Sequence, residues 1–350
     1  MNITQKTINT LEFDKIRAML AALAPTAGAA ELARELLPSD RAAVVRSNLK
    51  KTTDARRLAD AKGQPSFGGV SDITSALERA DKGATLTTRE LMDVGAVLRA
   101  SRALLEYIRS NRTFDTVLDE TFERLLPNKY LEEKISRSII SEDMIADEAS
   151  SELSDIRRKI RAANIRIKDN LKSFVSGSYS KYLQENIVTM RNGRYVVPVK
   201  AEYKSEVRGL VHDSSSSGAT VFVEPMSVVE ANNELRMLEA KEAHEIERVL
   251  YEMSAEVSGI SSALKLNYEN ITELAFIFAC AELSRKMKGC EPIISEDRRI
   301  VLKKARHPLI DPATVVPIDV SLGADKLKVS SLYRSAWLLP ERSRELLSKQ

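Results

Sequence analysis

The stretch from Asn186 to Pro225 most constrains the fold, because it has β-strand patterning in a sequence that is otherwise helical. Its dipeptide Asn192-Gly193 lies between Ile187–Arg191 and Arg194–Lys200, two runs that contain β-branched and aromatic residues. Asn-Gly in that setting predicts a two-residue hairpin, because both central residues of a type I′ turn need positive φ. The stretch therefore begins with a β-hairpin.

A second hairpin is predicted directly after the first. Its strands are Val207–Val211 and Ala219–Val223, and the loop between them runs from His212 to Gly218. Pro225 then ends the β-structure, because proline is suited to the start of a helix. Together the two hairpins predict a small antiparallel sheet at residues 186–225.

Helical periodicity flanks this sheet on both sides. Apolar residues recur at spacings of three and four from Leu153 to Phe174, and again from Val228 to Leu264. A narrow apolar seam on an otherwise charged helix favours a helix pair over a globular core. We therefore expect an antiparallel coiled-coil arm over residues 148–266 that projects by roughly 40 Å and carries the sheet at its tip.

The rest of the chain predicts a mainly α fold. The hydrophobic fraction is 43%, whereas aromatic residues are only 5%, a composition typical of helix-rich proteins. Residues 1–147 predict packed helices, including one that starts with a capping box at Thr87 and Glu90. Residues 267–300 predict a helical return to that core, and Cys280 is expected to lie inside it.

Composition also limits the classes of function. The net charge of +3 is too small for a protein that coats nucleic acid, so any basic surface must be local. Cys280 and Cys290 form neither a disulfide framework nor a metal-binding spacing. No apolar leader and no membrane-spanning run is apparent, so we expect a cytoplasmic protein without membrane contact.

Basic and aromatic side chains alternate in the predicted tip, as in surfaces that follow a phosphate backbone and stack on bases. The simpler interpretation is that these residues only face solvent. Ser215 and Ser216 lie in a serine-rich turn that could offer hydroxyl and amide groups to phosphate. The candidate nucleic-acid-binding residues are Lys181, Arg191, Asn192, Arg194, Tyr195, Lys200, Lys204, Arg208, Ser215 and Ser216.

No catalytic or metal-binding group is predicted. His212-Asp213-Ser214 contains the residue types of a catalytic triad, but neighbours in one loop rarely adopt the spatial arrangement that a triad needs. No carboxylate pair and no Cys/His arrangement stands above background. We therefore expect no catalytic residues and no metal.

Several stretches together resemble the type-two branch of the MutS family. They are LEFDKI at Leu11–Ile16, FGGVSDI at Phe67–Ile73, the long block Ser180–Leu235, ARHPL at Ala305–Leu309 and VVPIDVSLG at Val315–Gly323. The long block is the most specific of the five. The resemblance covers about residues 5–325.

The resemblance implies a helical core and lever, in which residues 186–225 form a clamp at the end of the lever. It implies that residues 301–328 begin an ATPase domain and that full-length relatives use ATP and Mg. Those relatives are ATPases and endonucleases, and homodimers are possible. The partners that it implies are branched or mismatched DNA, in recombination suppression and repair, or collided ribosomes and their rRNA.

The departures from the family pattern are equally informative. A P-loop needs G-x-x-x-x-G-K-[ST], and this motif does not occur; no glycine follows Gly323. His307 borders the family's nucleotide site, but without a P-loop no nucleotide-binding residues and no cofactor are predicted for this chain. Residues 329–350 form a divergent tail, and truncation or a frameshift near Val329 is our hypothesis for it. We expect the chain to bind nucleic acid without catalysis, and the alternative is a scaffold that binds a protein partner or the ribosome.

Overall fold

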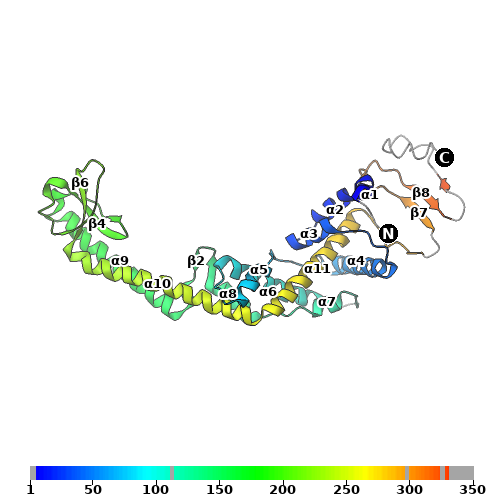
Figure 1. Ribbon diagram of the computed structural model, residues 1–350, viewed down its shortest axis with the longest axis horizontal. Helices are drawn as coiled ribbons and strands as arrows, with labels where there is room; N and C mark the ends of the chain where they lie inside the picture. The colour runs from blue at the N-terminus through cyan, green and yellow to red at the C-terminus, as the bar shows by residue number, and fades with distance from the viewer. Residues whose placement is uncertain (1–4, 111–113, 296–298, 324–327, 331–350) are drawn as a thin grey trace. The chain divides into compact units, whose positions relative to one another are not determined.

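The computed structural model describes residues 5–110, 114–295, 299–323 and 328–330, which form mainly α-helices with small antiparallel sheets (Figure 1). The mainly α prediction is therefore confirmed. The chain forms two compact units, and each unit uses more than one stretch of sequence. One unit comprises residues 1–72, 96–128 and 262–350, and the other comprises residues 73–95 and 129–261. Of the predicted tail at 329–350, all but the first two residues lie outside the described residues.

The first unit is built around helix α11, Ser261–Lys286, whose sequence is apolar on most sides. Its Phe278 is buried and packs edge-on against Phe67, Tyr107 and Phe122, at centroid distances of 6.1 to 6.4 Å. The other helices of this unit are α1 (Gln5–Thr10), α2 (Phe13–Ala21), α3 (Ala27–Glu35), α4 (Ala42–Lys62), α7 (Asp119–Glu123) and the second half of α6 (Thr88–Arg109).

The capping box predicted at the start of α6 is present. The backbone N–H of Glu90 donates to the Thr87 hydroxyl at 3.2 Å, and the backbone N–H of Thr87 donates to the Glu90 carboxylate at 2.9 Å. These bonds satisfy two amides that a helix start leaves without partners. The helix therefore begins where the sequence predicts.

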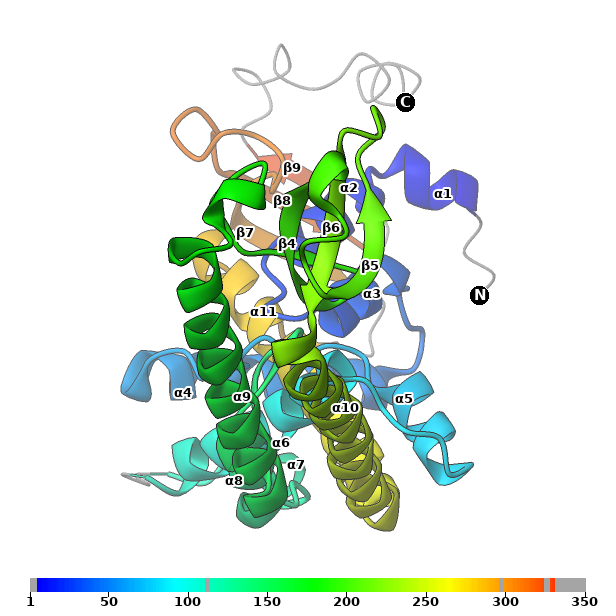
Figure 2. The ribbon, with the colours of Figure 1, turned by 90° about the vertical axis from the view of Figure 1, so that its left-hand side faces the viewer.

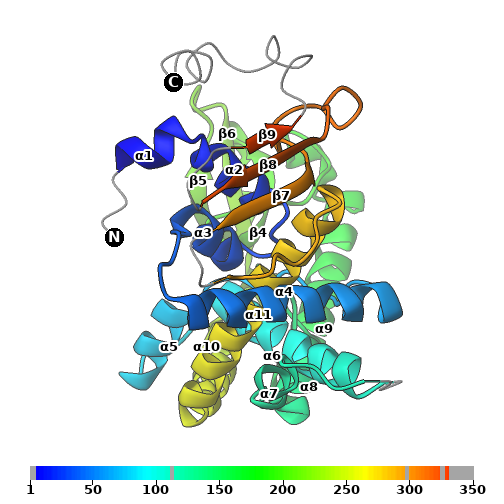
Figure 3. The ribbon, with the colours of Figure 1, turned by 90° about the vertical axis from the view of Figure 1, so that its right-hand side faces the viewer.

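The last described elements of the first unit form a three-stranded antiparallel sheet (Figure 3). Its strands are β7 (Ile300–Ala305), β8 (Ile318–Leu322) and β9 (Lys328–Ser330), in the order β7-β8-β9. Strand β8 begins at Ile318, directly after Pro317, because proline cannot donate a hydrogen bond to a neighbouring strand.

The second unit contains the two seams, which form a pair of long helices. Helix α9 spans Ser151–Ser176 and helix α10 spans Met226–Gly259, about 39 and 51 Å at the α-helical rise. The unit also contains α5 (Thr74–Asp81), α8 (Lys129–Ser138), β1 (Ile139–Ser141), β2 (Met144–Ile145) and the short helix η1 (Asp147–Ala149).

Helices α9 and α10 lie side by side and run antiparallel (Figure 2). Three contacts between the helices show that they run antiparallel: as the residue number rises on the α9 side, the residue number of the contacted glutamate on α10 falls. The Ser150 hydroxyl just before α9 donates to Glu245, Arg157 pairs with Glu242, and Arg166 pairs with Glu234.

Helix α10 ends at Gly259, before the predicted end of the arm at residue 266. The prediction that Leu264 continues the second seam is wrong, because Ile260 leaves the helix and Leu264 belongs to α11. The apolar spacing continues through this break, so periodicity alone does not reveal it. The glycine at the end of α10 is a local sign of the break, since glycine weakens a helix.

A four-stranded antiparallel sheet joins the two helices, in the order β3-β4-β6-β5. One core serves the sheet and the helices: Val197, Val199 and Val223 pack with Ile167 of α9 and Leu235 of α10. The sheet is therefore held on the helices by shared apolar packing. Its elements are β3 (Thr189–Arg191), β4 (Arg194–Lys200), β5 (Gly209–Ser214), β6 (Thr220–Pro225) and the short helices η2 (Ser180–Tyr182) and η3 (Ala201–Tyr203).

Candidate nucleic-acid interface

We use "tip" for residues 177–225, the segment between α9 and α10 that contains the four-stranded sheet. The predicted Asn192-Gly193 turn is confirmed: φ is 51° at Asn192 and 71° at Gly193, and Arg191 pairs with Arg194 across it. The Asn192 side-chain amide also donates to the His212 carbonyl at 3.2 Å. Asn192 therefore fixes the hairpin end against strand β5.

The structure places Arg194 in a buried ion pair. Its Nη1 donates to both carboxylate oxygens of Glu224, at 2.8 and 3.0 Å, and its Nη2 donates to the Asn233 side-chain oxygen at 2.6 Å. The Glu224 side chain is 0% exposed and that of Arg194 is 16% exposed. Arg194 therefore neutralises a buried carboxylate, and only a small part of it reaches solvent.

Two further groups complete the Glu224 site. The Asn232 side-chain amide donates to Glu224 at 2.7 Å, and His212 Nε2 lies 2.5 Å from the other carboxylate oxygen. A buried carboxylate is stable only when it is paired and hydrogen-bonded, and here strands β4 and β5 and helix α10 each supply a partner. The Glu224 site therefore holds the sheet to α10.

His212 lies in strand β5 and not in the predicted loop, so the predicted strand end at Val211 is wrong. The pairing of β5 with β6 is irregular between Val211 and Asp213, as in a β-bulge. A bulge redirects a side chain within a strand, which is how His212 reaches Glu224. The turn between the strands is correspondingly short, and it begins at Ser215.

Arg191 is half-buried beside strand β6. Its Nε lies 3.4 Å from Asp213 Oδ2, and its guanidinium stacks 4.1 Å above the Phe222 ring. Tyr195 is also engaged internally, since its hydroxyl donates to the Asn164 side chain of α9 at 2.7 Å. Both side chains therefore make contacts within the protein that stabilise the tip.

Four tip cations have no acidic partner among the described residues, and three of these four are exposed. The lysine amines of Lys181 and Lys200 lie near tyrosine rings, at 4.8 Å from Tyr182 and 5.9 Å from Tyr203. Unpaired cations beside aromatic rings are available to a phosphate backbone. The four are Lys181, Lys200, Lys204 and Arg208, with Lys200 half-buried.

Ser215 and Ser216 lie in the turn between β5 and β6, and the two differ in their roles. The Ser215 hydroxyl accepts from the Thr220 amide at 3.1 Å, and its carbonyl accepts from the Gly218 amide at 2.8 Å. Ser216 is exposed. Ser215 therefore shapes the turn, whereas Ser216 is open to solvent.

The two long helices carry opposite charge. Helix α9 has seven Lys or Arg and three Asp or Glu, whereas α10 has eight Glu and three Lys or Arg. Three exposed α9 lysines, Lys159, Lys168 and Lys172, have no ion-pair partner among the described residues. The basic helix is thus the one that leads directly into Lys181.

A hydrogen bond from Ser150, just before α9, to Glu245 of α10 joins the two helices at the end opposite the tip. Glu245 is buried; Arg248 donates to it at 2.6 and 2.8 Å and Ser150 at 2.5 Å. The Arg248 hydrogen bonds lower the pKa of Glu245 to about 2. Glu245 is therefore ionised wherever the protein is folded near neutral pH.

Sequence reasoning missed two features of the tip. It did not identify Glu224 as a buried anion, although a lone Glu between Val223 and Pro225 in a strand was a detectable sign. It also missed Tyr179, which is exposed and stacks on Phe174 at 4.3 Å. Tyr179 lies in a turn without periodicity, so no pattern could have selected it.

Curated relatives match nearly the whole chain. Endonuclease MutS2 of Acetivibrio thermocellus is 45% identical over 327 residues, which are 92% of this chain and 41% of that protein. Endonuclease MutS2 of Ruminiclostridium cellulolyticum is 44% identical over 94% of this chain, and that of Clostridium acetobutylicum is 40% identical over 92%. The chain belongs to the type-two branch of the MutS family. It spans about two fifths of the length of these relatives, and no family model matches it.

The nucleotide-site residue suggested by the MutS resemblance, His307, is exposed in the loop between β7 and β8. Its Nδ1 accepts from the Leu309 amide at 3.3 Å. Among the described residues no group of three or more His, Cys, Asp or Glu could hold a metal ion, and no helix is long and apolar enough to cross a membrane.

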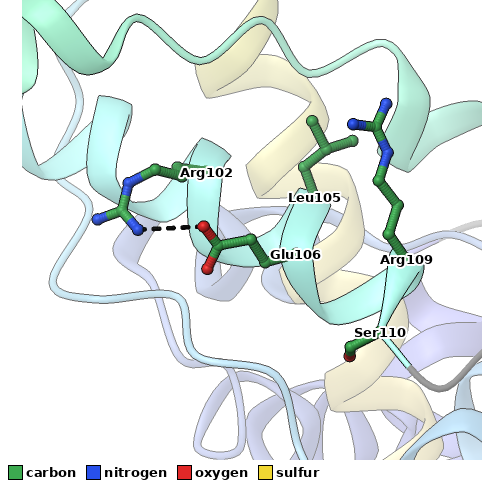
Figure 4. Close-up of a pocket in the computed structure, with 5 residues that line it drawn as sticks. All are labelled: Arg102, Leu105, Glu106, Arg109 and Ser110. Atoms are coloured by element: carbon green, nitrogen blue, oxygen red, sulfur yellow. Dashed lines mark hydrogen bonds and ion pairs between the residues drawn. The ribbon is translucent and has the colours of Figure 1, made fainter.

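Elsewhere in this MutS-family chain, a hollow of about 480 Å³ lies against α6 and is lined by five residues (Figure 4). The Arg102 guanidinium pairs with Glu106 at 3.3 Å, and Arg109 adds a second cation to the lining. Its lining offers no nucleophile paired with a base. The lining residues are Arg102, Leu105, Glu106, Arg109 and Ser110.

Proposed function

We propose that the tip and the basic helix α9 form a nucleic-acid-binding surface, with α9 and α10 as the lever and the sheet as the clamp of a MutS-type protein. The observation that carries the proposal is the charge contrast between the helices, which continues into the unpaired tip cations. A phosphate backbone is attracted to the α9 side and repelled by the acidic α10 side. The favoured ligand is DNA, branched or mismatched.

The contacts of the candidate residues divide the tip into two parts. Lys181, Lys200, Lys204 and Arg208 supply the contacts with phosphate. Arg194 and Arg191 stabilise the sheet that presents them, because both are engaged with acidic side chains of the tip. A substitution at Arg194 therefore tests the stability of the tip and not its surface.

The proposal is tested with two matched pairs of charge reversals. K181E/K204E reverses two exposed tip lysines, and K241E/K265E reverses two exposed lysines elsewhere, on α10 and α11. Both pairs change the net charge equally. Fluorescence anisotropy with a four-way junction, a linear duplex and an rRNA fragment should show weaker binding for the tip pair only.

The outcome also separates the competing functions. Preference for the junction supports a role on branched DNA, whereas preference for the rRNA fragment supports ribosome binding. Equal effects of the two variant pairs, or no binding to any of the three ligands, would refute a nucleic-acid-binding tip and leave the scaffold hypothesis.

A further inference from the structure

Four aromatic rings form a row that runs from the end of α9 into the tip. Phe174 at the end of α9 stacks on Tyr179 at 4.3 Å with an interplanar angle of 7°. Tyr179 lies 6.3 Å from Tyr182, and Tyr182 lies 5.3 Å from Tyr203, both in tilted geometry. The row connects α9 with η2 and η3, which are separate in the sequence.

Two rings of the row pack on the core, and the other two are exposed to solvent. Phe174 and Tyr182 pack against the shared core of the tip and helices. Tyr179 is 39% exposed and Tyr203 is 37% exposed. Large exposed aromatic residues cost free energy in water, and rings fixed by a core lose little entropy when a ligand stacks on them.

Lysines accompany the row. Lys181 Nζ lies 4.8 Å from the centre of the Tyr182 ring, and Lys200 Nζ lies 5.9 Å from that of Tyr203. Neither amine has an acidic partner among the described residues. The row thus combines aromatic rings, on which bases can stack, with positive charges that can hold phosphates.

We propose that this row binds unpaired nucleotides, with bases stacked on Tyr179 and Tyr203 and phosphates held by Lys181 and Lys200. The inference rests on the proposed nucleic-acid function and names its ligand class. Bases inside a duplex are already stacked on each other and cannot present their faces to tyrosine rings. The row therefore selects single-stranded segments, such as those at a junction, a gap or an RNA loop, over continuous duplex.

Alanine substitutions at the two exposed tyrosines test this selection. Y179A and Y203A should each weaken binding of labelled oligothymidine by about 5- to 150-fold, the range seen when a stacking aromatic side chain is removed. Binding of a blunt hairpin duplex should change less than twofold. The unchanged duplex binding shows that the tip of each alanine variant is still folded. Y203F keeps the ring and should bind as the unmodified chain does, which separates the role of the ring from that of its hydroxyl.

Tyr130 provides a matched control. It is an exposed tyrosine on α8 with Lys134 at 6.0 Å, but the row does not include it. Y130A should leave oligothymidine affinity unchanged. Oligouridine in place of oligothymidine distinguishes an RNA strand from a DNA strand, since both offer unpaired bases.

A second measurement detects stacking directly. 2-Aminopurine placed within the oligothymidine should change in fluorescence on binding, and this change should be lost in Y179A and Y203A. The proposal is overturned if both variants bind oligothymidine as the unmodified chain does, or if they weaken duplex and single strand equally. If the tyrosine variants have no effect while K181E/K204E weakens duplex binding, only this inference fails. If the lysine variant also has no effect, the proposed function fails with it.

Discussion

Removal of Arg194 should destabilise the tip far more than removal of its hairpin partner Arg191. R194M leaves the Glu224 carboxylate, which is 0% exposed, without its cation. Breaking a buried ion pair in this way costs ~3–5 kcal/mol. Because Asn232 and His212 still contact the carboxylate, we expect the lower end of this range, about 3 kcal/mol.

Amide hydrogen exchange of β4 and β6 measures this loss locally, without requiring two-state unfolding of the whole chain. Protection of those strands should fall by roughly a hundredfold, since 1.4 kcal/mol corresponds to a factor of ten. R191M is the matched control, because Arg191 pairs with Asp213 at a more exposed site and should cost about 1 kcal/mol, or less than tenfold. The double variant R194M/E224Q, which removes both charges, should recover part of the loss. Equal losses in R194M and R191M would refute the structural role of the buried pair.

Three further predictions concern packing, pH and thiol chemistry. A Cβ added at Gly209 would lie 2.2 Å from a β6 carbonyl oxygen, so G209A should lower the hydrogen-exchange protection of β5 and β6. A Cβ added at Gly259 meets no atom within 4 Å, so G259A should be neutral or should stabilise the fold by up to about 1 kcal/mol. Because the pKa of Glu245 is lowered in the folded chain, its ionised form stabilises the fold fully above about pH 4.5, and this stabilisation is lost as the pH falls toward about 2. The urea midpoints of the unmodified chain and of E245Q should therefore differ at neutral pH and converge as the pH is lowered. Burial raises the pKa of the Cys280 thiol to about 12, so a thiol reagent should label the exposed Cys290 in the native chain and Cys280 only after unfolding. Rapid labelling of a native C290S variant would contradict this prediction.

The sequence predicted those parts of the fold that depend on local pattern. The Asn192-Gly193 turn follows from backbone preference, and the two long helices follow from the spacing of their apolar residues. The pairing of Arg194 with Glu224 could not be predicted, because it depends on the register between β4 and β6 and on the position of α10. The same holds for His212, whose contact depends on a bulge that no residue type marks.

The sequence predicted which residue types the candidate site contains, but not the contacts that each of them makes. The sequence identified the basic residues of the tip, but not which of them are occupied by internal partners. Lys204 and Arg194 are equivalent in a charge pattern, yet one is exposed and the other neutralises a buried carboxylate. Only tertiary packing distinguishes the two roles.

The salt dependence of duplex binding tests the central claim most directly. For contacts with phosphate, the logarithm of the binding constant falls linearly with the logarithm of salt concentration, and each lost contact reduces the slope by about one. K181E/K204E should therefore reduce the slope by about two, whereas K241E/K265E should leave it unchanged. An unchanged slope in K181E/K204E, or an equal reduction in both variants, would contradict a nucleic-acid-binding tip.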